Sequence, residues 1–145
     1  HAVGGGRENH FVSRPPERPG ASFMGNNNSA WMAVDLGVGR RLQPSHYALR
    51  CDGTKWGGRY APPRRWELQA AESMAGPWTT LRRHDNDSGI AAAAYAEASW
   101  PLEGEQSREA FQCFRVQQHG HNAWGDNYLV LAGIELYGTL TQGRV

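Results

Sequence analysis

The chain has 145 residues, of which 39% are hydrophobic and 20% are charged, and its formal net charge is +1. This length predicts one domain with its own hydrophobic core, and the balanced charge argues against nucleic acid as a partner. The 18 Gly and 8 Pro favour a β-rich domain with many loops over a helical one. No apolar run approaches the length of about 18 residues that a membrane span needs, so we expect no membrane insertion.

Two cysteines, Cys51 and Cys113, fall within strand-like segments. We expect both to be buried free thiols, because isolated cysteines in such segments behave as small apolar residues. The sequence has neither a recognisable signal peptide nor the dense disulfide framework of small secreted domains. These features favour an intracellular, cytoplasmic protein.

The elements predicted along the chain are short strands separated by turns. Residues 1–25 are rich in Gly, Arg and Pro and predict an irregular N-terminal arm. Residues 26–140 predict a single β-sandwich domain, and residues 141–145 form a tail. Seven or eight short strands with frequent turn residues favour an all-β fold, an antiparallel β-sandwich. We expect strands over residues 30–36, 46–51, 66–70, 78–82, 96–102, 111–117 and 128–137.

Four tryptophans lie in the expected strands. Large aromatic side chains contribute most to the burial of apolar surface, so we expect these four in the core or at its edge. They are Trp31, Trp66, Trp78 and Trp100.

The segment from Phe111 to Leu140 is the most informative part of the chain. Two apolar runs flank a loop of His, Gly, Asn, Trp and Asp residues. A polar and aromatic loop held between two strands is typical of a binding surface carried by a rigid sheet. The chain is therefore interpreted first as a recognition module.

Six sequence blocks together resemble the coagulation factor 5/8 type C (discoidin) domain. The resemblance is strongest to the intracellular branch of that family, which occurs in BTB/POZ proteins and in HECT-type ubiquitin ligases. It implies a galactose-binding-like jelly roll. Extracellular members usually join their two ends by a disulfide, and neither end of this chain carries Cys, which favours the intracellular branch. The blocks are NSAWMAVDLG (28–37), HYALR (46–50), RRWELQAAESMAGPWTTLRRHDND (64–87), ASWPL (98–102), FRVQQHG (114–120) and NYLVLAGIELYGTL (127–140).

The resemblance implies that loops at one end of the sandwich carry recognition. The segments similar to those loops are residues 23–29, 52–63 and 119–127. An aromatic residue and an Arg on a Gly-rich loop are the types enriched at interaction hot spots. The alternative is that Trp56 folds back onto the sandwich while Arg59 pairs with a carboxylate. The candidate ligand-binding residues are Asn27, Asn28, Trp56, Arg59, Tyr60, His119, His121, Asn122, Trp124 and Asp126.

Some of these residue types also hold metal ions. Gly120 predicts a turn between His119 and His121, so the two rings are not expected on one side. No further ligand follows at a recognised spacing, and the acidic stretch 85–87 lacks the spacing of an EF-hand. We expect neither a metal nor a cofactor. Arg64 and Arg65, just before a strand, are of a type that contacts phosphate or carboxylate, although a solvated strand entry is the commoner role.

No nucleophile elbow, P-loop or His-Glu-x-x-His helix occurs in the sequence. We therefore expect a non-catalytic module that binds a protein or peptide partner within a larger intracellular protein, such as a ubiquitin ligase or a BTB adaptor. The alternative is a carbohydrate-binding module, in which an aromatic face and polar donors surround a sugar. A third interpretation is a structural domain that packs only against its own neighbours. The sugar-binding residues would be His119, Asn122, Trp124 and Asp126.

Overall fold

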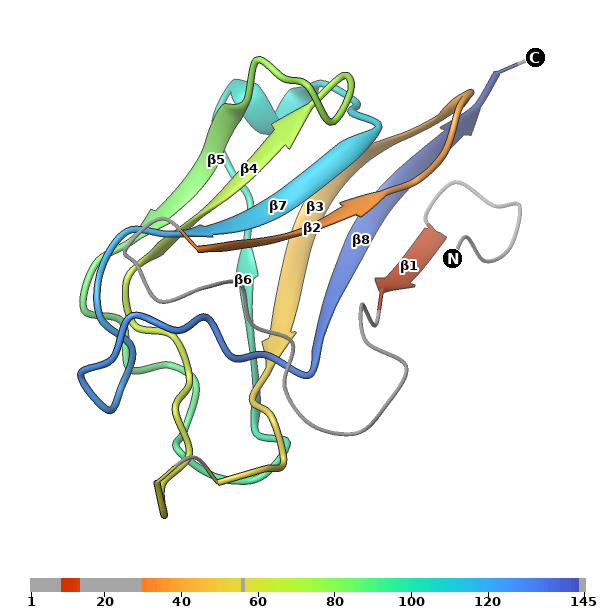
Figure 1. Ribbon diagram of the computed structural model, residues 1–145. Coiled ribbons are helices and arrows are strands. Elements are labelled where there is room, and N and C mark those ends of the chain that lie inside the picture. The colour runs from red at the N-terminus through yellow and green to blue at the C-terminus, as the bar shows by residue number, and fades with distance from the viewer. Residues whose placement is uncertain (1–8, 14–29, 56, 144–145) are drawn as a thin grey trace.

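The computed structural model describes residues 9–13, 30–55 and 57–143. This part of the chain forms eight strands and one short 3-10 turn (Figure 1). No helix in it is long and apolar enough to cross a membrane. The elements are β1 Asn9–Ser13, β2 Trp31–Asp35, β3 Arg40–Arg50, β4 Trp66–Ala71, β5 Thr79–His84, β6 Glu97–Pro101, η1 Gln106–Arg108, β7 Cys113–Gln118 and β8 Gly133–Gln142.

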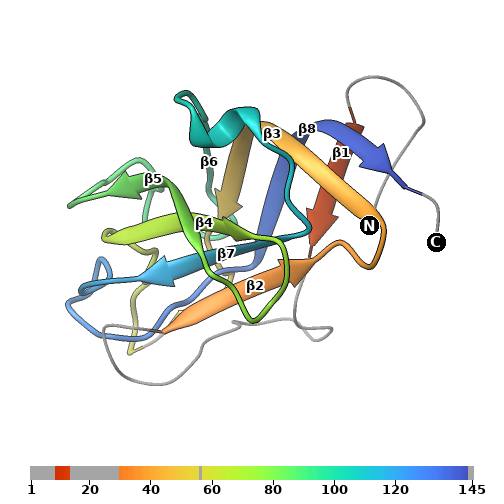
Figure 2. The ribbon, with the colours of Figure 1, turned by 90° about the horizontal axis from the view of Figure 1, so that it is seen from above.

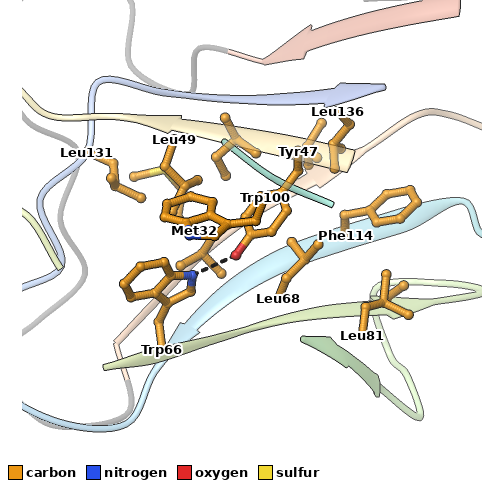
Figure 3. Packing of buried hydrophobic residues seen from close by; sticks show 14 of the residues in the cluster. Met32, Tyr47, Leu49, Trp66, Leu68, Leu81, Trp100, Phe114, Leu131 and Leu136 are labelled. Carbon is orange, nitrogen blue, oxygen red and sulfur yellow. Dashed lines mark hydrogen bonds between the residues drawn. The ribbon is translucent and has the colours of Figure 1, made fainter. Parts of the chain in front are cut away.

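The strands form two sheets of four, with the orders β1-β8-β3-β6 and β2-β7-β4-β5. All strand pairs are antiparallel. Figure 2 shows the two sheets as separate layers, and the buried apolar side chains fill the space between them (Figure 3). The prediction of an all-β antiparallel sandwich is confirmed.

Alternation of buried and half-buried residues along the strands explains this packing. In β4, Trp66, Leu68 and Ala70 point inward while the residues between them lie on the outer face, as expected for a side-chain period of two. In β2 the inward residues are Met32 and Val34. Trp31 is therefore on the outer face, where it is 37% exposed. The prediction that Trp31 lies in the core or at its edge is wrong, because its register in β2 places its side chain on the outer face of the sheet.

Both cysteines are free and buried, as expected. Burial raises the pKa of the Cys51 thiol to about 11 and that of Cys113 to about 12. Thiols with such pKa values are inert at neutral pH, since the thiolate is the reactive form.

Residues 9–13, which the sequence assigned to an irregular arm, form the edge strand β1. They pair with β8 from Asn9 opposite Gly138 to Ser13 opposite Ile134. The sandwich therefore includes a strand from within residues 1–25. The structure does not describe residues 1–8 or 14–29.

Two other strands differ in extent from the prediction. A strand was expected only from residue 46, but β3 begins at Arg40 and runs through Pro44, with a register shift between Pro44 and His46. A bulge of this kind accommodates a residue that cannot donate a ladder hydrogen bond. β8 begins only at Gly133, since residues 129–131 are consecutively buried without the alternation of a strand.

A chain of hydrogen bonds crosses the core between the two sheets. The indole Nε1 of Trp66 donates to the Tyr47 hydroxyl oxygen at 2.9 Å (Figure 3), and that hydroxyl lies 2.6 Å from Nε2 of His84. His84 Nδ1 lies 2.7 Å from Oδ2 of Asp87. The His84 ring also stacks on Trp66, with ring centroids 4.0 Å apart. These contacts give each of the four buried or half-buried polar groups a partner, as buried polar groups require.

Lowering the pH is expected to destabilise the fold through His84. Burial lowers the pKa of His84 below its ordinary value of 6.5, and the hydrogen bond to Asp87 only partly opposes this shift. Between the lowered pKa and 6.5 the unfolded chain binds more protons than the folded one. The free energy of unfolding is therefore greatest above pH 6.5 and falls as the pH drops through this window, by at most about 1.4 kcal/mol per pH unit.

Urea unfolding at about pH 7.5 and about pH 5.5 measures this loss. NMR of the His84 ring over the same pH range checks this residue directly. The ring should remain mostly neutral at pH 6.5, where an ordinary histidine is half protonated. An ordinary titration of His84 would contradict the prediction.

Candidate functional site

Three connecting segments gather at one end of the sandwich, which we call the loop end: residues 51–65, 85–96 and 119–132 (Figure 1). Backbone hydrogen bonds join the first segment to each of the others. Ala123 N donates to Pro62 O at 2.9 Å, and Asp87 N donates to Arg64 O at 2.8 Å. The expected loops 52–63 and 119–127 are thus brought together. The third expected loop, 23–29, lies outside the described residues, and so do Asn27, Asn28 and Trp56.

Trp124 lies at the centre of the loop end and is half-buried. The guanidinium carbon of Arg59 lies 6.0 Å from the centroid of its ring. Gly57, with φ of +61°, lies against the same ring, and a Cβ at this position would overlap the Trp124 side chain. Only glycine combines this backbone conformation with so close an approach. Two residues of the segment 51–65 therefore pack against a tryptophan of the segment 119–132.

Asn122 holds the turn that presents Trp124. Its side chain is 4% exposed, and its Oδ1 accepts hydrogen bonds from the backbone N–H groups of Trp124 and Asp126, each at 3.0 Å. Its Nδ2 donates to Tyr128 O at 3.0 Å. These bonds occupy the amide in organising the loop, which is the common use of Asn in turns. We therefore assign Asn122 a positioning role within the candidate site.

The two candidate histidines do not converge. His119 turns toward β5, where its Nε2 donates to the carbonyl oxygen of His84 at 2.9 Å. His121 is exposed, and its carbonyl oxygen accepts from Arg65 Nη1 at 3.2 Å. Within residues 9–13, 30–55 and 57–143, no group of three or more His, Cys, Asp or Glu side chains is placed to hold a metal ion.

Trp124 lines two pockets at the loop end. The first, which we call the apolar pocket, has a volume of about 240 Å³ and is lined by Gly57, Ala61, Asn122, Trp124, Asp126, Tyr128 and Val130. The second, the basic pocket, has a volume of about 430 Å³ and is lined by Lys55, Gly58, Arg59, Tyr60, Arg64, Ala92, Ala123 and Trp124. Four of the candidate residues thus line a pocket: Arg59, Tyr60, Trp124 and Asp126.

Two basic residues that line the second pocket, Lys55 and Arg64, were not among the candidate ligand-binding residues. Lys55 carried no motif at all. Arg64 and Arg65 looked equivalent in the sequence, but the structure separates them. Arg65 donates to His121 O and to Asn86 Oδ1, whereas Arg64 lines the pocket with a buried Nε that has no hydrogen-bond partner among the described residues. The Arg64-Arg65 pair in the sequence indicated a possible contact with an anion, but only the fold shows that Arg64 is the member that lines the pocket.

The fold is that of the F5/8 type C domain. The F5/8 type C domain of a Bacteroides fragilis protein superposes with a TM-score of 0.54 at 16% identity, covering 82% of this chain and 73% of that one. A SusE-like protein superposes with a TM-score of 0.56 at 16% identity, covering 91% of this chain and 52% of that one. A scan against protein-family models gave no match. The resemblance seen in the sequence is confirmed by these folds.

In sequence, the chain is similar to E3 ubiquitin-protein ligase Ufd4 of Drosophila melanogaster. The two are 36% identical over an alignment of 115 residues, and the match covers 78% of this chain and 4% of Ufd4. The chain therefore spans only a small part of the length of this relative. The similarity agrees with the expected link to ubiquitin ligases.

Proposed function

We propose that this domain is a non-catalytic binding module that recognises a protein or peptide partner through the loop end. The observation that carries the proposal is the pair of pockets that share Trp124 as a wall. A half-buried tryptophan beside an arginine, held by two loops on a rigid sandwich, has the composition of an interaction hot spot. The similarity to Ufd4 supports a setting within a larger intracellular protein of the ubiquitin-ligase type.

The contacts at the loop end favour a protein or peptide over a carbohydrate. Of the four residues suited to a sugar, Asn122 is occupied by loop backbone and His119 donates to the carbonyl oxygen of His84. Only Trp124 and Asp126 remain to contact a sugar ring, and sugar sites need several convergent polar groups. We expect a glycan array to give no specific binding, and a saturable signal that Trp124→Ala removes would restore the carbohydrate alternative.

Changing Trp124 or Arg59 to Ala is expected to reduce partner capture by about 30-fold, since truncation of a hot-spot residue costs about 2 kcal/mol or more. Arg59 is exposed, so Arg59→Ala should leave the unfolding temperature nearly unchanged. The measurement is quantitative mass spectrometry of proteins retained from a cell lysate by the immobilised chain and by each variant.

Arg108→Ala serves as the matched control. Arg108 is also exposed, and it lies in η1 at the opposite end of the sandwich (Figure 1). This variant should retain the same proteins as the unchanged chain. Equal retention by the Arg59, Trp124 and Arg108 variants would remove the loop end as the binding surface.

A further inference from the structure

We propose that the loop end binds a peptide in which an oxyanion group lies next to an apolar side chain. The oxyanion enters the basic pocket and the apolar side chain enters the apolar pocket. This inference rests on the proposed function and narrows it to one ligand chemistry.

The basic pocket is built to receive a negative charge. Lys55, Arg59 and Arg64 line it, and no Asp or Glu is among its lining residues. In the part of the chain that the structure describes, none of these three cations forms an ion pair. Three cations gathered without a counter-charge repel one another, and an oxyanion placed between them relieves that repulsion.

Arg64 supplies the second observation. Its Nε is buried and has no hydrogen-bond partner among the described residues. A buried donor without a partner is costly to the protein. An arginine offers a planar set of N–H donors whose geometry matches a carboxylate or a phosphate. A ligand oxyanion in the basic pocket is placed to accept from this side chain.

Aromatic rings lie beside the other two cations. Lys55 Nζ lies 5.7 Å from the centroid of the Tyr60 ring, and the Arg59 guanidinium faces the Trp124 ring at 6.0 Å. Cation–π contacts at these distances are attractive. Side chains ordered before binding lose less conformational entropy when the ligand arrives.

The apolar pocket fits the remainder of the ligand. Ala61 and Val130 are buried at its walls, and Trp124 and Tyr128 contribute aromatic surface. Its volume of about 240 Å³ is below the range of sites for whole drug-sized molecules and suits one side chain. Both pockets touch Trp124, so the two bound groups must be near neighbours in the ligand. Neighbouring side chains of an extended peptide meet this requirement.

Asp126 gives the site a direction. It lines the apolar pocket, whereas the basic pocket is lined by Lys55, Arg59 and Arg64, so the two pockets that share Trp124 differ in the sign of their charged residues. A ligand oxyanion is attracted to the basic side and repelled from the other. A peptide with a lysine in place of the acidic residue should therefore be excluded from the basic pocket.

The test is a series of NMR titrations of the 145-residue chain with short peptides. The reference is N-acetylated, C-amidated Gly-Leu-Glu-Leu-Gly, which places an apolar residue on each side of the acid. In matched peptides, Gln or Lys replaces Glu. Two further arms separate the sources of the oxyanion: one carries phosphoserine in place of Glu, and one carries Gln with a free C-terminal carboxylate.

We expect at least one oxyanion-bearing peptide to bind about tenfold more tightly than the amidated Gln peptide. The reason is that the oxyanion accepts charge-assisted hydrogen bonds from the basic pocket, which the neutral Gln side chain does not form. Amide shifts should map to residues 57–64 and 122–128. Lys55→Gln and Arg64→Gln should each reduce the preference for the oxyanion, whereas Arg108→Gln should preserve it. Lys55 is exposed, so its variant tests the pocket without disturbing the core.

Equal affinity of all three oxyanion-bearing peptides and of the amidated Gln and Lys peptides would overturn this inference, while binding of these peptides at the loop end would leave the proposed function in place. No shift with any peptide would also overturn it. In that case the capture experiment with Arg59 and Trp124 variants decides separately whether the loop end binds a partner of another chemistry.

Discussion

Replacing Tyr47 by Phe is expected to lower the free energy of unfolding by about 2 to 5 kcal/mol, because each buried polar group left without a partner costs about 1–3 kcal/mol. The Tyr47 hydroxyl connects Trp66 Nε1 and His84 Nε2, at 2.9 and 2.6 Å. Tyr47 and Trp66 are fully buried and His84 nearly so, so water cannot readily replace the lost hydroxyl. Guanidinium or urea unfolding measures the loss directly.

Tyr137→Phe is the matched control, since it removes the same atom from the same residue type. Tyr137 is half-buried in β8, and its hydroxyl lies 3.3 Å from Glu135 Oε2. We expect a change within about 0.5 kcal/mol, as for surface substitutions in general. Equal losses in the two variants would show that the hydrogen-bond chain through the core is not stabilising.

Gly138→Ala is expected to lower the free energy of unfolding by an amount similar to that of Tyr47→Phe, because the structure has no space for a side chain at this position. Gly138 faces Pro44 across the β3–β8 ladder at the bulge. A Cβ at this position would overlap the carbonyl oxygen of Gln43 and the Cα of Pro44. Both are backbone atoms, so the central strand itself would have to move. Overpacking of this kind costs about 3 kcal/mol or more when the neighbours cannot adjust.

Gly143→Ala provides the comparison, because a Cβ there would lie 3.7 Å from the carbonyl oxygen of Gly39, which is an ordinary van der Waals contact. We expect Gly143→Ala to change the free energy of unfolding little. Nearly all of the loss caused by Gly138→Ala should therefore remain as a difference between the two variants when both are measured under the same conditions. A stable Gly138→Ala protein would mean that the bulge can shift to another position.

The strands with clear alternation were predictable from the sequence. Trp66 to Ala70 was expected as a strand with Trp66 inward, and the structure bears this out. The full length of β3 was not predictable, because Pro44 looks like a strand end unless the bulge and the glycine opposite it are known. The strand expected over residues 128–137 begins too early, because residues 129–131 are buried in a loop. A buried loop and a buried strand both give a continuous run of apolar residues, so the sequence pattern does not distinguish them.

The candidate site was predictable at the level of loops but not of single contacts. The segments around Arg59 and Trp124 were expected to lie at one end, and they do lie together. The use of Asn122 to fold its own loop depends on backbone groups that the sequence does not place. The buried Nε of Arg64 depends in the same way on a fold that turns Arg64 and its neighbour Arg65 to different partners.

The pairing of β1 with β8 determines where this unit can be cut from a longer chain. β8 lies between β1 and β3 in its sheet, so a fragment beginning after Ser13 would leave one side of β8 with unsatisfied backbone N–H and C=O groups. Such an open side recruits strands from other molecules and promotes aggregation. A fragment of this chain that begins at the tryptophan block of residues 28–37 would omit β1, and poor solubility of that fragment would then reflect a missing sheet neighbour and not an unstable core.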